Sequence, residues 1–367
     1  MKFTCERSVL LKEITIANEI ISSKNAISIL SNIYLEAGDG GLTIKATDMK
    51  VNFETKVPVE VIEPGSVTVY ADKFYGILNS IPDGEIEFEQ KDSRINIKTS
   101  AKKAKFQLKS MASEKFPEFT VPAKEFFEIP IKNLKDMIKE TIFAISIDET
   151  RYYMNGIYFE KNENSFKMVA TDGRRLAFIS KPAAEGSPAE FPGVIVPSKI
   201  FNIVMRRSGD EGMAGICVSD KTIFIKFGSY SLSSVLIEGE FPNYRRIIPE
   251  KQEKIFKVNR LEMLEALKRV SLLVEEKSHR VYLGLSTGMV SIYCEENDIG
   301  NAREEISCVY EGEEHTIALN YRYIEEPFKV ASADEISIMF TDPSKTLTIM
   351  PVPEQDFFHL VMPMQQE

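Results

Sequence analysis

Ile33-Tyr34-Leu35-Glu36 recurs as Ile157-Tyr158-Phe159-Glu160 and again as Val281-Tyr282-Leu283-Gly284, and each stretch begins 124 residues after the previous one. Positions further along keep the same phase: Ile44, Met168 and Ile292; Ala46, Ala170 and Cys294; Asp48, Asp172 and Glu296. A period this long is that of a whole domain. Chance similarity is the alternative, because strands in general favour Ile, Val and Tyr. The agreement extends to the flanking segments, which favours a true threefold repeat.

Each repeat has a helical pattern upstream of this strand pair. Apolar residues at helical spacing form one-sided stripes: Leu10, Ile14, Ala17 and Ile21; Leu134, Ile138, Ile142 and Ile145; Leu264 and Leu267. A residue whose short side chain can accept a hydrogen bond from a free helical N–H begins each pattern, namely Ser8, Asn133 and Asn259. We therefore expect a first helix in every repeat, with these three residues at its N-terminus.

A second, shorter helical pattern follows in each repeat. The three segments begin at Asp72, Ser198 and Asn320, and each has a cation near its start. The third segment contains Pro327, which has no backbone N–H and is expected to end or kink the helix.

Alternating polar and apolar stretches fill the rest of each repeat, for example at 85–89, 94–98 and 222–226. Turns such as Gly38-Asp-Gly-Gly41 and Pro82-Asp-Gly84 separate such stretches. Many antiparallel strands with two helices per repeat predict an α+β fold, with the helices on one face of the sheets.

Proline-containing segments at equivalent places, around Phe116-Pro117 and Phe241-Pro242, separate the repeats. We predict three domains, at residues 1–122, 123–248 and 249–367. A chain of 367 residues is long enough for two or three domains of ordinary size.

The composition is that of a soluble globular protein, with 43% hydrophobic and 27% charged residues. No apolar run is long enough to cross a bilayer, and the first residues lack the apolar core of a signal peptide. The cysteines Cys5, Cys217, Cys294 and Cys308 lie far apart in sequence. This spacing favours reduced thiols and a cytoplasmic location.

The net charge of −10 taken alone argues against a protein that binds nucleic acid tightly. The cations are nevertheless clustered on the expected helices: Lys132, Lys135 and Lys139; Lys199, Arg206 and Arg207; Lys268 and Arg269. One interpretation is ordinary solvated helix faces. The other is a basic surface that holds DNA through its phosphates, weakly and without sequence preference.

Motifs for chemistry are absent from the sequence. The three histidines have no partner at metal-ligand spacing, and no phosphate-binding or nucleophile motif occurs. Asp172-Gly-Arg-Arg175 could be a catalytic cluster, but Asp-Gly is a turn dipeptide, and repeat one keeps Asp48 without the arginines. We therefore interpret Asp172 as structural, and we expect no metal, no cofactor and no catalytic activity.

Four motifs identify a resemblance that covers essentially the whole chain. Arg151-Tyr-Tyr-Met-Asn-Gly156, Ala170-Thr-Asp-Gly-Arg-Arg-Leu-Ala177, Gly239-Glu-Phe-Pro-Asn-Tyr-Arg-Arg246 and Val361-Met-Pro-Met364 occur here in the same order as in the bacterial β sliding clamp. That family is the processivity subunit of the DNA polymerase III holoenzyme. The resemblance implies a head-to-tail homodimer in which six domains close a ring, with helices lining the hole and sheets outside.

The resemblance also implies two functional surfaces. Duplex DNA would pass through the ring and contact Lys24, Lys73, Tyr152, Tyr153 and Lys199. A peptide-binding pocket would tether the polymerase catalytic subunit, the clamp loader, and other polymerases and repair proteins. The residues that match this pocket are Arg151, Met154, Thr171, Gly173, Arg174, Arg175, Leu176, Pro242, Arg246, Ile247, Asn320, Tyr323, Thr346, Leu360, Met362, Pro363 and Met364.

The sequence departs from the family pattern at three places near this pocket. The family commonly has His where Arg174 stands and Leu where Met154 stands, and it commonly ends with Arg where this chain has Gln365-Gln-Glu367. For the dimer, the resemblance places Lys103 and Lys105 on a basic strand, opposite an acidic strand with Glu304 and Glu305. Leu272 and Leu273 would add apolar contacts.

Two other classes of function compete with a clamp. One is an adaptor of three related domains that binds peptides without encircling DNA, and failure to dimerise would favour it. The other is an enzyme with a carboxylate site between domains, which would show turnover or a metal requirement.

Overall fold

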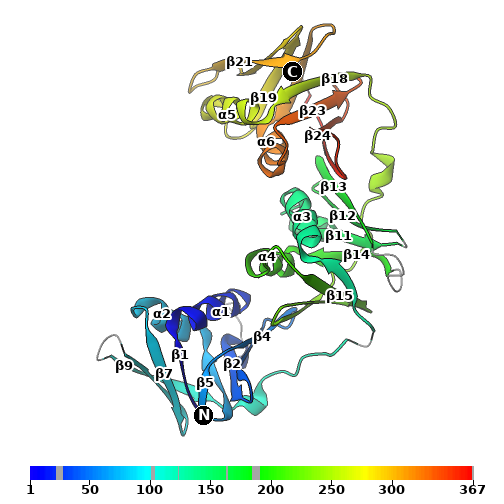
Figure 1. Cartoon of the computed structure of the whole chain (residues 1–367). Coiled ribbons are helices and arrows are strands. Elements are labelled where there is room, and N and C mark those ends of the chain that lie inside the picture. The colour runs from blue at the N-terminus through cyan, green and yellow to red at the C-terminus, as the bar shows by residue number, and fades with distance from the viewer. Residues whose placement is uncertain (22–27, 101–103, 123, 163, 184–190, 366–367) are drawn as a thin grey trace. The chain divides into compact units, whose positions relative to one another are not determined.

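The computed structural model describes residues 1–21, 28–100, 104–122, 124–162, 164–183 and 191–365 (Figure 1). They form two compact units: Met1–Lys132 with Lys199–Leu236, and Asn133–Ser198 with Ile237–Glu367. The three predicted domains divide the chain differently, and their boundaries remain predictions.

The first unit is built on one extended sheet. Its strands, in spatial order, are β10 (Phe127–Pro130), β15 (Met213–Ser219), β16 (Thr222–Phe227), β17 (Tyr230–Val235), β4 (Val51–Val57), β3 (Gly41–Thr47), β2 (Asn32–Gly38), β6 (Gly65–Tyr70), β9 (Lys105–Met111), β8 (Arg94–Thr99), β7 (Glu85–Lys91), β1 (Lys2–Glu6) and β5 (Glu60–Glu63). The pairings along it are antiparallel.

The second unit has a sheet of the same kind. Its order is β14 (Phe191–Pro197), β11 (Gly156–Lys161), β12 (Ser165–Thr171), β13 (Arg175–Pro182), β25 (Phe357–Val361), β24 (Leu347–Val352), β23 (Glu335–Phe340), β18 (Lys254–Asn259), β21 (Ala302–Val309), β20 (Met289–Cys294), β19 (Arg280–Ser286) and β22 (His315–Asn320).

The hairpin registers confirm the repeat. Leu35 lies opposite Ile44 in β2–β3, Phe159 opposite Met168 in β11–β12, and Leu283 opposite Ile292 in β19–β20. All six side chains are fully buried. A slip of one residue would turn each apolar set toward solvent, so the shared register follows from the shared apolar pattern.

Two helices accompany the sheet strands of each repeat. The bounds are α1 (Arg7–Ile20), α2 (Ala71–Ser80), α3 (Ile131–Thr141), α4 (Ser198–Arg207), α5 (Arg260–Val270) and α6 (Tyr321–Val330); short 3₁₀ segments are η1 (Ser28–Ser31), η2 (Ser113–Lys115), η3 (Ile142–Ala144), η4 (Glu149–Met154), η5 (Tyr244–Arg246) and η6 (Ser271–Leu273). In the first unit α1 and α2 lie side by side, and in the second unit α5 and α6 do so (Figure 1).

The predicted N-caps are confirmed only in the third repeat. The side chain of Asn259 accepts hydrogen bonds from the N–H groups of Leu261 and Glu262, and Asn320 accepts one from the N–H of Arg322. Ser8 and Asn133, by contrast, lie inside α1 and α3, so the prediction that they cap those helices is wrong.

The physical reason is that α1 and α3 begin directly after β1 and β10, earlier than expected, so Glu6 and Pro130 precede these helices. A backbone carbonyl accepts the first helical N–H in all three repeats, and among the described residues of these three helix starts only α5 has a side-chain cap as well. The N–H of Arg7, the first residue of α1, donates to Gly84 O at 2.9 Å. The equivalent bonds are Ile131 N to Gly212 O at 2.9 Å and Arg260 N to Asp334 O at 2.8 Å. Asp72 lies inside α2 and Ser198 is the first residue of α4, so neither residue precedes its helix as expected.

Helix α6 does not end at Pro327. It continues to Val330, and the N–H of Ala331 donates to Pro327 O at 3.1 Å. Of the two expected effects of this proline, an end or a kink, the end is therefore wrong. Pro327 and its neighbour Phe328 are both buried, so apolar packing offsets the missing backbone hydrogen bond.

The repeats are joined by backbone pairing between strand edges. In the first unit β4 of repeat one pairs with β17 of repeat two, with Phe53 opposite Leu232. In the second unit β13 of repeat two pairs with β25 of repeat three, with Ala177 opposite His359. Each of the two sheets is therefore continuous across a boundary between repeats.

We predict different effects for two substitutions at expected caps. Asn259→Ala should lower the free energy of unfolding by about 1 kcal/mol, because two N–H groups of α5 lose their acceptor. Ser8→Ala is the matched control and should change it by less than about 0.5 kcal/mol, because exposed Ser8 caps nothing in α1. Hydrogen exchange at Leu261 and Glu262, read with urea unfolding, measures both effects. Equal losses in the two variants would contradict the assignment.

Candidate functional site

A tight turn after β12 organises the region around Asp172. Asp172 Oδ1 accepts hydrogen bonds from the N–H groups of Arg174 at 2.9 Å and Arg175 at 3.1 Å. Gly173 has φ +86°, and a Cβ there would lie 2.9 Å from Arg151 Nη1, so both backbone and space favour glycine. Asp48 accepts in the same way from Lys50 and Val51. The structural interpretation of Asp172 is confirmed.

Arg175 is held on several sides. Its Nε donates to Asp172 Oδ2 at 3.1 Å, and its Nη2 donates to Phe143 O at 2.6 Å. The guanidinium also lies 4.8 Å from the ring centroid of Tyr323 on α6. Because these contacts use the guanidinium of Arg175, it holds the turn in place and has few N–H donors left for a ligand.

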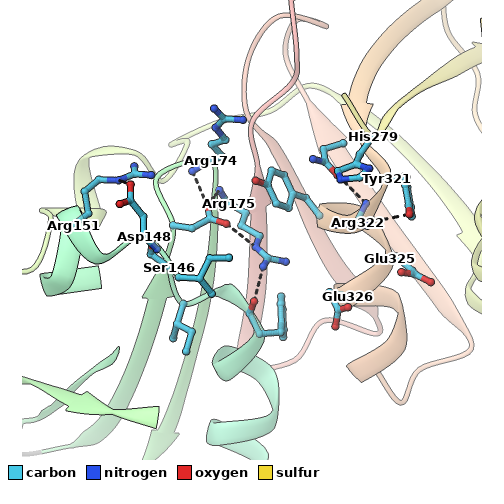
Figure 2. A pocket seen from close by; sticks show the side chains of 16 residues that line it. Ser146, Asp148, Arg151, Arg174, Arg175, His279, Tyr321, Arg322, Glu325 and Glu326 are labelled. Atoms are coloured by element: carbon cyan, nitrogen blue, oxygen red, sulfur yellow. Dashed lines mark hydrogen bonds and ion pairs between the residues drawn. The ribbon is translucent and has the colours of Figure 1, made fainter. Parts of the chain in front are cut away.

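A pocket of about 620 Å³ opens beside this turn (Figure 2). One wall comes from the segment after α3 and from the 172–175 turn, and the other comes from the start of α6 together with His279. Five of the residues predicted to bind peptide line it: Arg151, Arg174, Arg175, Asn320 and Tyr323.

The tail after β25 is bonded on both sides. The N–H of Met362 donates to Arg174 O at 2.9 Å, and the N–H of Met364 donates to Ala318 O at 2.8 Å. These bonds fix the backbone of the tail, while 51% of Met362 remains exposed. Met362 therefore stands as an apolar side chain in solvent on an anchored backbone.

The other predicted pocket residues divide into two sets. Met154, Thr171, Leu176 and Leu360 are buried, and Leu176 and Leu360 belong to an apolar cluster with Val169, Phe241 and Tyr244. Pro242, Thr346, Pro363 and Met364 are half-buried, whereas Arg246 and Ile247 are exposed. The buried set forms the floor of this region, and the accessible set forms its surface.

The sequence did not point to several residues that line the pocket. These are Phe143, Ile145, Ser146, Ile147, Asp148, His279, Tyr321, Arg322, Glu325 and Glu326. Ile147 is 95% exposed, but nothing in the sequence marked it. Arg322 had a signal, because it is the cation near the start of the second helix of repeat three. The others come from segments whose neighbours in space are far away in sequence.

A buried pair of titratable side chains, His359 and Glu140, lies close to the pocket residue Phe143. His359 Nε2 is 3.1 Å from Glu140 O and 3.5 Å from Glu140 Oε2. Burial raises the pKa of Glu140 to about 7 and lowers the pKa of His359 to about 4. Both groups are therefore held toward their neutral forms.

The residues expected to contact DNA differ in exposure and in their bonds within the chain. Lys24 lies outside the described residues. Lys199 Nζ donates to Asp48 Oδ2 at 2.6 Å and to Ile20 O at 2.8 Å. Lys73 is exposed, with Asp72 at 3.7 Å. Tyr152 is 53% exposed, and Tyr153 is partly buried against the apolar cluster.

Several clustered cations also have partners within the chain. Arg206 pairs with Glu19, Arg207 donates to Lys12 O, and Lys139 donates to Val330 O. These cations therefore bind groups of their own chain; Lys139 and Arg206 are also exposed, whereas Arg207 is half-buried. Both interpretations of the basic helices stay open.

The residues expected at the dimer interface lie on exposed strands or loops. Lys105 is exposed on β9, whereas Lys103 lies outside the described residues. Leu272 is 76% exposed, while Leu273 packs partly against the core of repeat three. Glu304 accepts two hydrogen bonds from Arg269, and Glu305 accepts from Arg303.

Three further findings bear on the class of protein. Among the described residues, no three His, Cys, Asp or Glu side chains gather as a metal site. No helix in the described part of the chain is long and apolar enough to cross a membrane. The four cysteines are free thiols.

Family models match almost the whole chain in three successive segments. They are the N-terminal domain of the DNA polymerase III beta subunit at residues 1–122, its central domain at 128–243 and its C-terminal domain at 245–365. These matches, with the two antiparallel sheets, confirm the predicted α+β class of three tandem clamp domains.

Similar proteins are beta sliding clamps from several bacteria. The chain is 46% identical to that of Treponema pallidum and 33% identical to that of Caulobacter vibrioides, with full coverage of both chains. Among solved structures, a DnaN sliding clamp from Bartonella birtlesii bound to griselimycin matches with a TM-score of 0.91 and 30% identity, and covers both chains fully. One from Pseudomonas aeruginosa matches with a TM-score of 0.91 and 28% identity, again with full coverage.

We predict opposite pH effects for two variants of the buried pair. The Glu140 pKa is raised from 4.5 to about 7, so its contribution to stability is present at low pH and is lost as pH rises through that range. The His359 pKa is lowered from 6.5 to about 4, so its contribution is lost as pH falls from 6.5. The two contributions cancel in the wild type between these limits.

Relative to the wild type, Glu140→Gln should therefore lose stability as pH falls from 7 to 4.5. His359→Gln should gain stability over nearly the same range. Each group can contribute up to about 1.4 kcal/mol per pH unit. Urea unfolding of the three proteins at matched pH values measures both slopes. Variants whose stability runs parallel to the wild type would show that the pair does not titrate in this way.

Proposed function

This chain belongs to the beta sliding clamp family, the beta subunit of DNA polymerase III, and we propose that two copies close head to tail into a ring around duplex DNA. The ring tethers the replicative polymerase through its peptide-binding site and so confers processivity. The protein itself catalyses no reaction, and it acts in the cytoplasm.

The proposal of a ring rests on one type of strand pairing between repeats, which occurs twice within the chain and could occur a third time between two chains. Strand β4 of repeat one pairs with β17, and the equivalent β13 of repeat two pairs with β25. In repeat three the strand equivalent to β4 and β13 is β21. In repeat one the strand equivalent to β17 and β25 is β9. If β21 of one copy pairs with β9 of another, the same junction forms a third time, and two copies close into a ring.

The edges of β9 and β21 are suited to such pairing. Strand β9 pairs with β8 along Lys105–Lys109, while its partner on the other side, β6, meets it at Ser110 and Met111. Strand β21 pairs with β20 along Ala302–Ser307, while β18 meets it at Cys308 and Val309. Free N–H and C=O groups along an exposed strand favour pairing with another strand.

The charges and the apolar contacts support the same pairing. Strand β9 presents exposed Lys105 and Lys109, and β21 presents Glu304 and Glu305. Leu272 adds an apolar side chain that is 76% exposed in the single chain. We propose these residues, with Lys103 and Leu273, as the dimer interface.

DNA contact is proposed for the helices of the ring interior. A sliding protein needs weak, sequence-independent contacts to phosphates, and the acidic net charge of −10 is compatible with cations confined to one surface. Tyr152 and Lys73 are exposed, whereas Lys199 is half-buried and would have to exchange its bond to Asp48 for a phosphate. We propose these residues, with Lys24 and Tyr153, as the contacts to duplex DNA.

Peptide binding is proposed for the surface between the 172–175 turn and the tail. Met362 offers an adaptable apolar contact, and half-buried Pro242, Pro363 and Met364 extend it. Short motifs with aliphatic and aromatic anchors would dock there. The partners would be the polymerase catalytic subunit, the clamp loader, and other polymerases and repair proteins with such motifs.

We predict that Met362→Ala weakens peptide binding about tenfold, because a hot-spot side chain that is lost typically costs more than 1 kcal/mol. The measurement is fluorescence polarisation of a labelled Gln-Leu-x-Leu-Phe peptide titrated with the full chain. Met213→Ala is the matched control, since Met213 is 46% exposed in the other unit. Unchanged affinity in Met362→Ala would remove the tail from the site.

We predict that Leu272→Asp converts the dimer to monomers, because a buried charge without a partner opposes association. Native mass spectrometry and sedimentation measure the state. Val121→Asp places the same charge at another exposed apolar residue and should leave the dimer intact. A wild type that is monomeric at all concentrations would overturn the ring and favour the adaptor.

A further inference from the structure

Arg174 and Arg322 stand on opposite walls of the pocket, and neither guanidinium has a carboxylate partner among the pocket residues (Figure 2). Arg174 follows the tight turn at Asp172, and Arg322 lies in the first turn of α6. The side chain of Arg322 packs over its neighbour Tyr321, with 5.9 Å between guanidinium and ring centroid.

The carboxylates of the pocket are already engaged elsewhere. Asp148 binds Arg151 at 3.1 Å, and Asp172 binds Arg175 at 3.1 Å. Glu325 and Glu326 both bind Lys329, at 2.8 Å and 3.4 Å. Arg174 and Arg322 are therefore two positive charges without a paired carboxylate, in a lining that has four arginines and four carboxylates in all.

The start of α6 adds to this positive potential. Its first turn contains no acidic residue, and its N-terminus opens on the pocket beside Asn320. Backbone N–H groups at a helix N-terminus favour a negative charge. Asn320 accepts the N–H of Arg322 and His279 O accepts that of Tyr321, while the following N–H groups of the first turn remain for the helix dipole.

We propose that this pocket accepts a carboxylate side chain from the partner peptide, held between Arg174 and Arg322. The proposal rests on the peptide-binding function proposed above and names the chemistry that selects among partners. Arg174 is placed for this role, because its own carbonyl accepts the N–H of Met362 at the start of the tail. A peptide seated on the tail would therefore pass directly beside the pocket.

A peptide carboxylate fits the pocket better than a DNA phosphate. Four arginines and four carboxylates line the pocket, so it has no net positive charge to hold the many phosphates of a duplex backbone. A single carboxylate can lie between two arginines, at a distance from those acids. The exposed Ile147 and the ring of Tyr323 offer apolar contact to the peptide around that charge.

The test uses pairs of labelled Gln-Leu-x-Leu-Phe peptides that differ only by Asp against Asn. The substituted position is x in one pair, and the residue before or after the motif in two others. Fluorescence polarisation gives the affinity of each peptide for the full-length wild type, Arg322→Gln, Arg174→Gln and Lys91→Gln. Lys91 is an exposed cation of the other unit and serves as the control.

We expect the wild type and Lys91→Gln to bind the Asp member of at least one pair about tenfold more tightly, because charge-assisted hydrogen bonds are strong. In Arg322→Gln that preference should fall to about twofold or less, while the Asn peptide binds as it does to the wild type. The preference should also shrink as salt is raised.

The outcomes separate the two proposals. If no peptide binds the wild type, the proposed peptide site itself fails. If Asp and Asn peptides bind the wild type equally, or Arg322→Gln keeps the preference, the carboxylate pocket is overturned while the peptide site stands. If Arg322→Gln instead loses retention on nicked circular duplex and keeps the peptide preference, the pocket serves DNA and the proposal is wrong.

Discussion

Backbone pairing between strand edges is the constraint on which the rest of this molecule depends. A sheet edge exposes N–H and C=O groups that must find partners, and here strands of successive repeats supply them to one another. The candidate site is a consequence of one such junction. Pairing of β13 with β25 begins at Arg175 opposite Val361, and the bond from Met362 N to Arg174 O continues it by one step. The tail is therefore aligned beside the 172–175 turn by the same hydrogen bonds that join two repeats.

Charge is used differently at equivalent positions of the repeats. Asp48 and Asp172 each hold a turn with one carboxylate oxygen. The second oxygen of Asp48 binds Lys199, and that of Asp172 binds Arg175. One inherited turn thus anchors a helix cation in the first unit and positions a pocket arginine in the second. Pairing of this kind explains how an acidic chain keeps cations at defined places.

Much of the fold could be predicted because the apolar pattern repeats. Ile33, Ile157 and Val281 are all fully buried, and their strands have equivalent registers. The N-caps of the first two repeats could not be predicted, because the acceptor is a backbone carbonyl some eighty residues away, as in Arg7 N to Gly84 O. The end expected at Pro327 failed because local propensity gives no measure of the burial that keeps α6 together.

The candidate site was predictable only in part, for a similar reason. The resemblance placed Arg174, Arg175 and Tyr323 together, and they do line one pocket. It gave no account of Ile147, His279 or Arg322, which come from loops and helix ends brought near by the sheet. Met154 and Leu360 proved to be buried, since sequence motifs do not distinguish a residue that supports a surface from one that forms it.

The carbonyl caps at the helix starts have a consequence for how the repeats could diverge. Every residue offers the same main-chain carbonyl, so mutation of Asp334 to another residue need not remove the acceptor. Gly84 and Gly212 have φ of +138° and +95°, so the backbone itself favours glycine there. Duplicated copies of an ancestral domain could therefore differ in the acceptor's side chain, as these three residues do, and keep the same helix starts. Such drift is compatible with three repeats that share residues mainly in the buried strands, where close packing restricts the side chains.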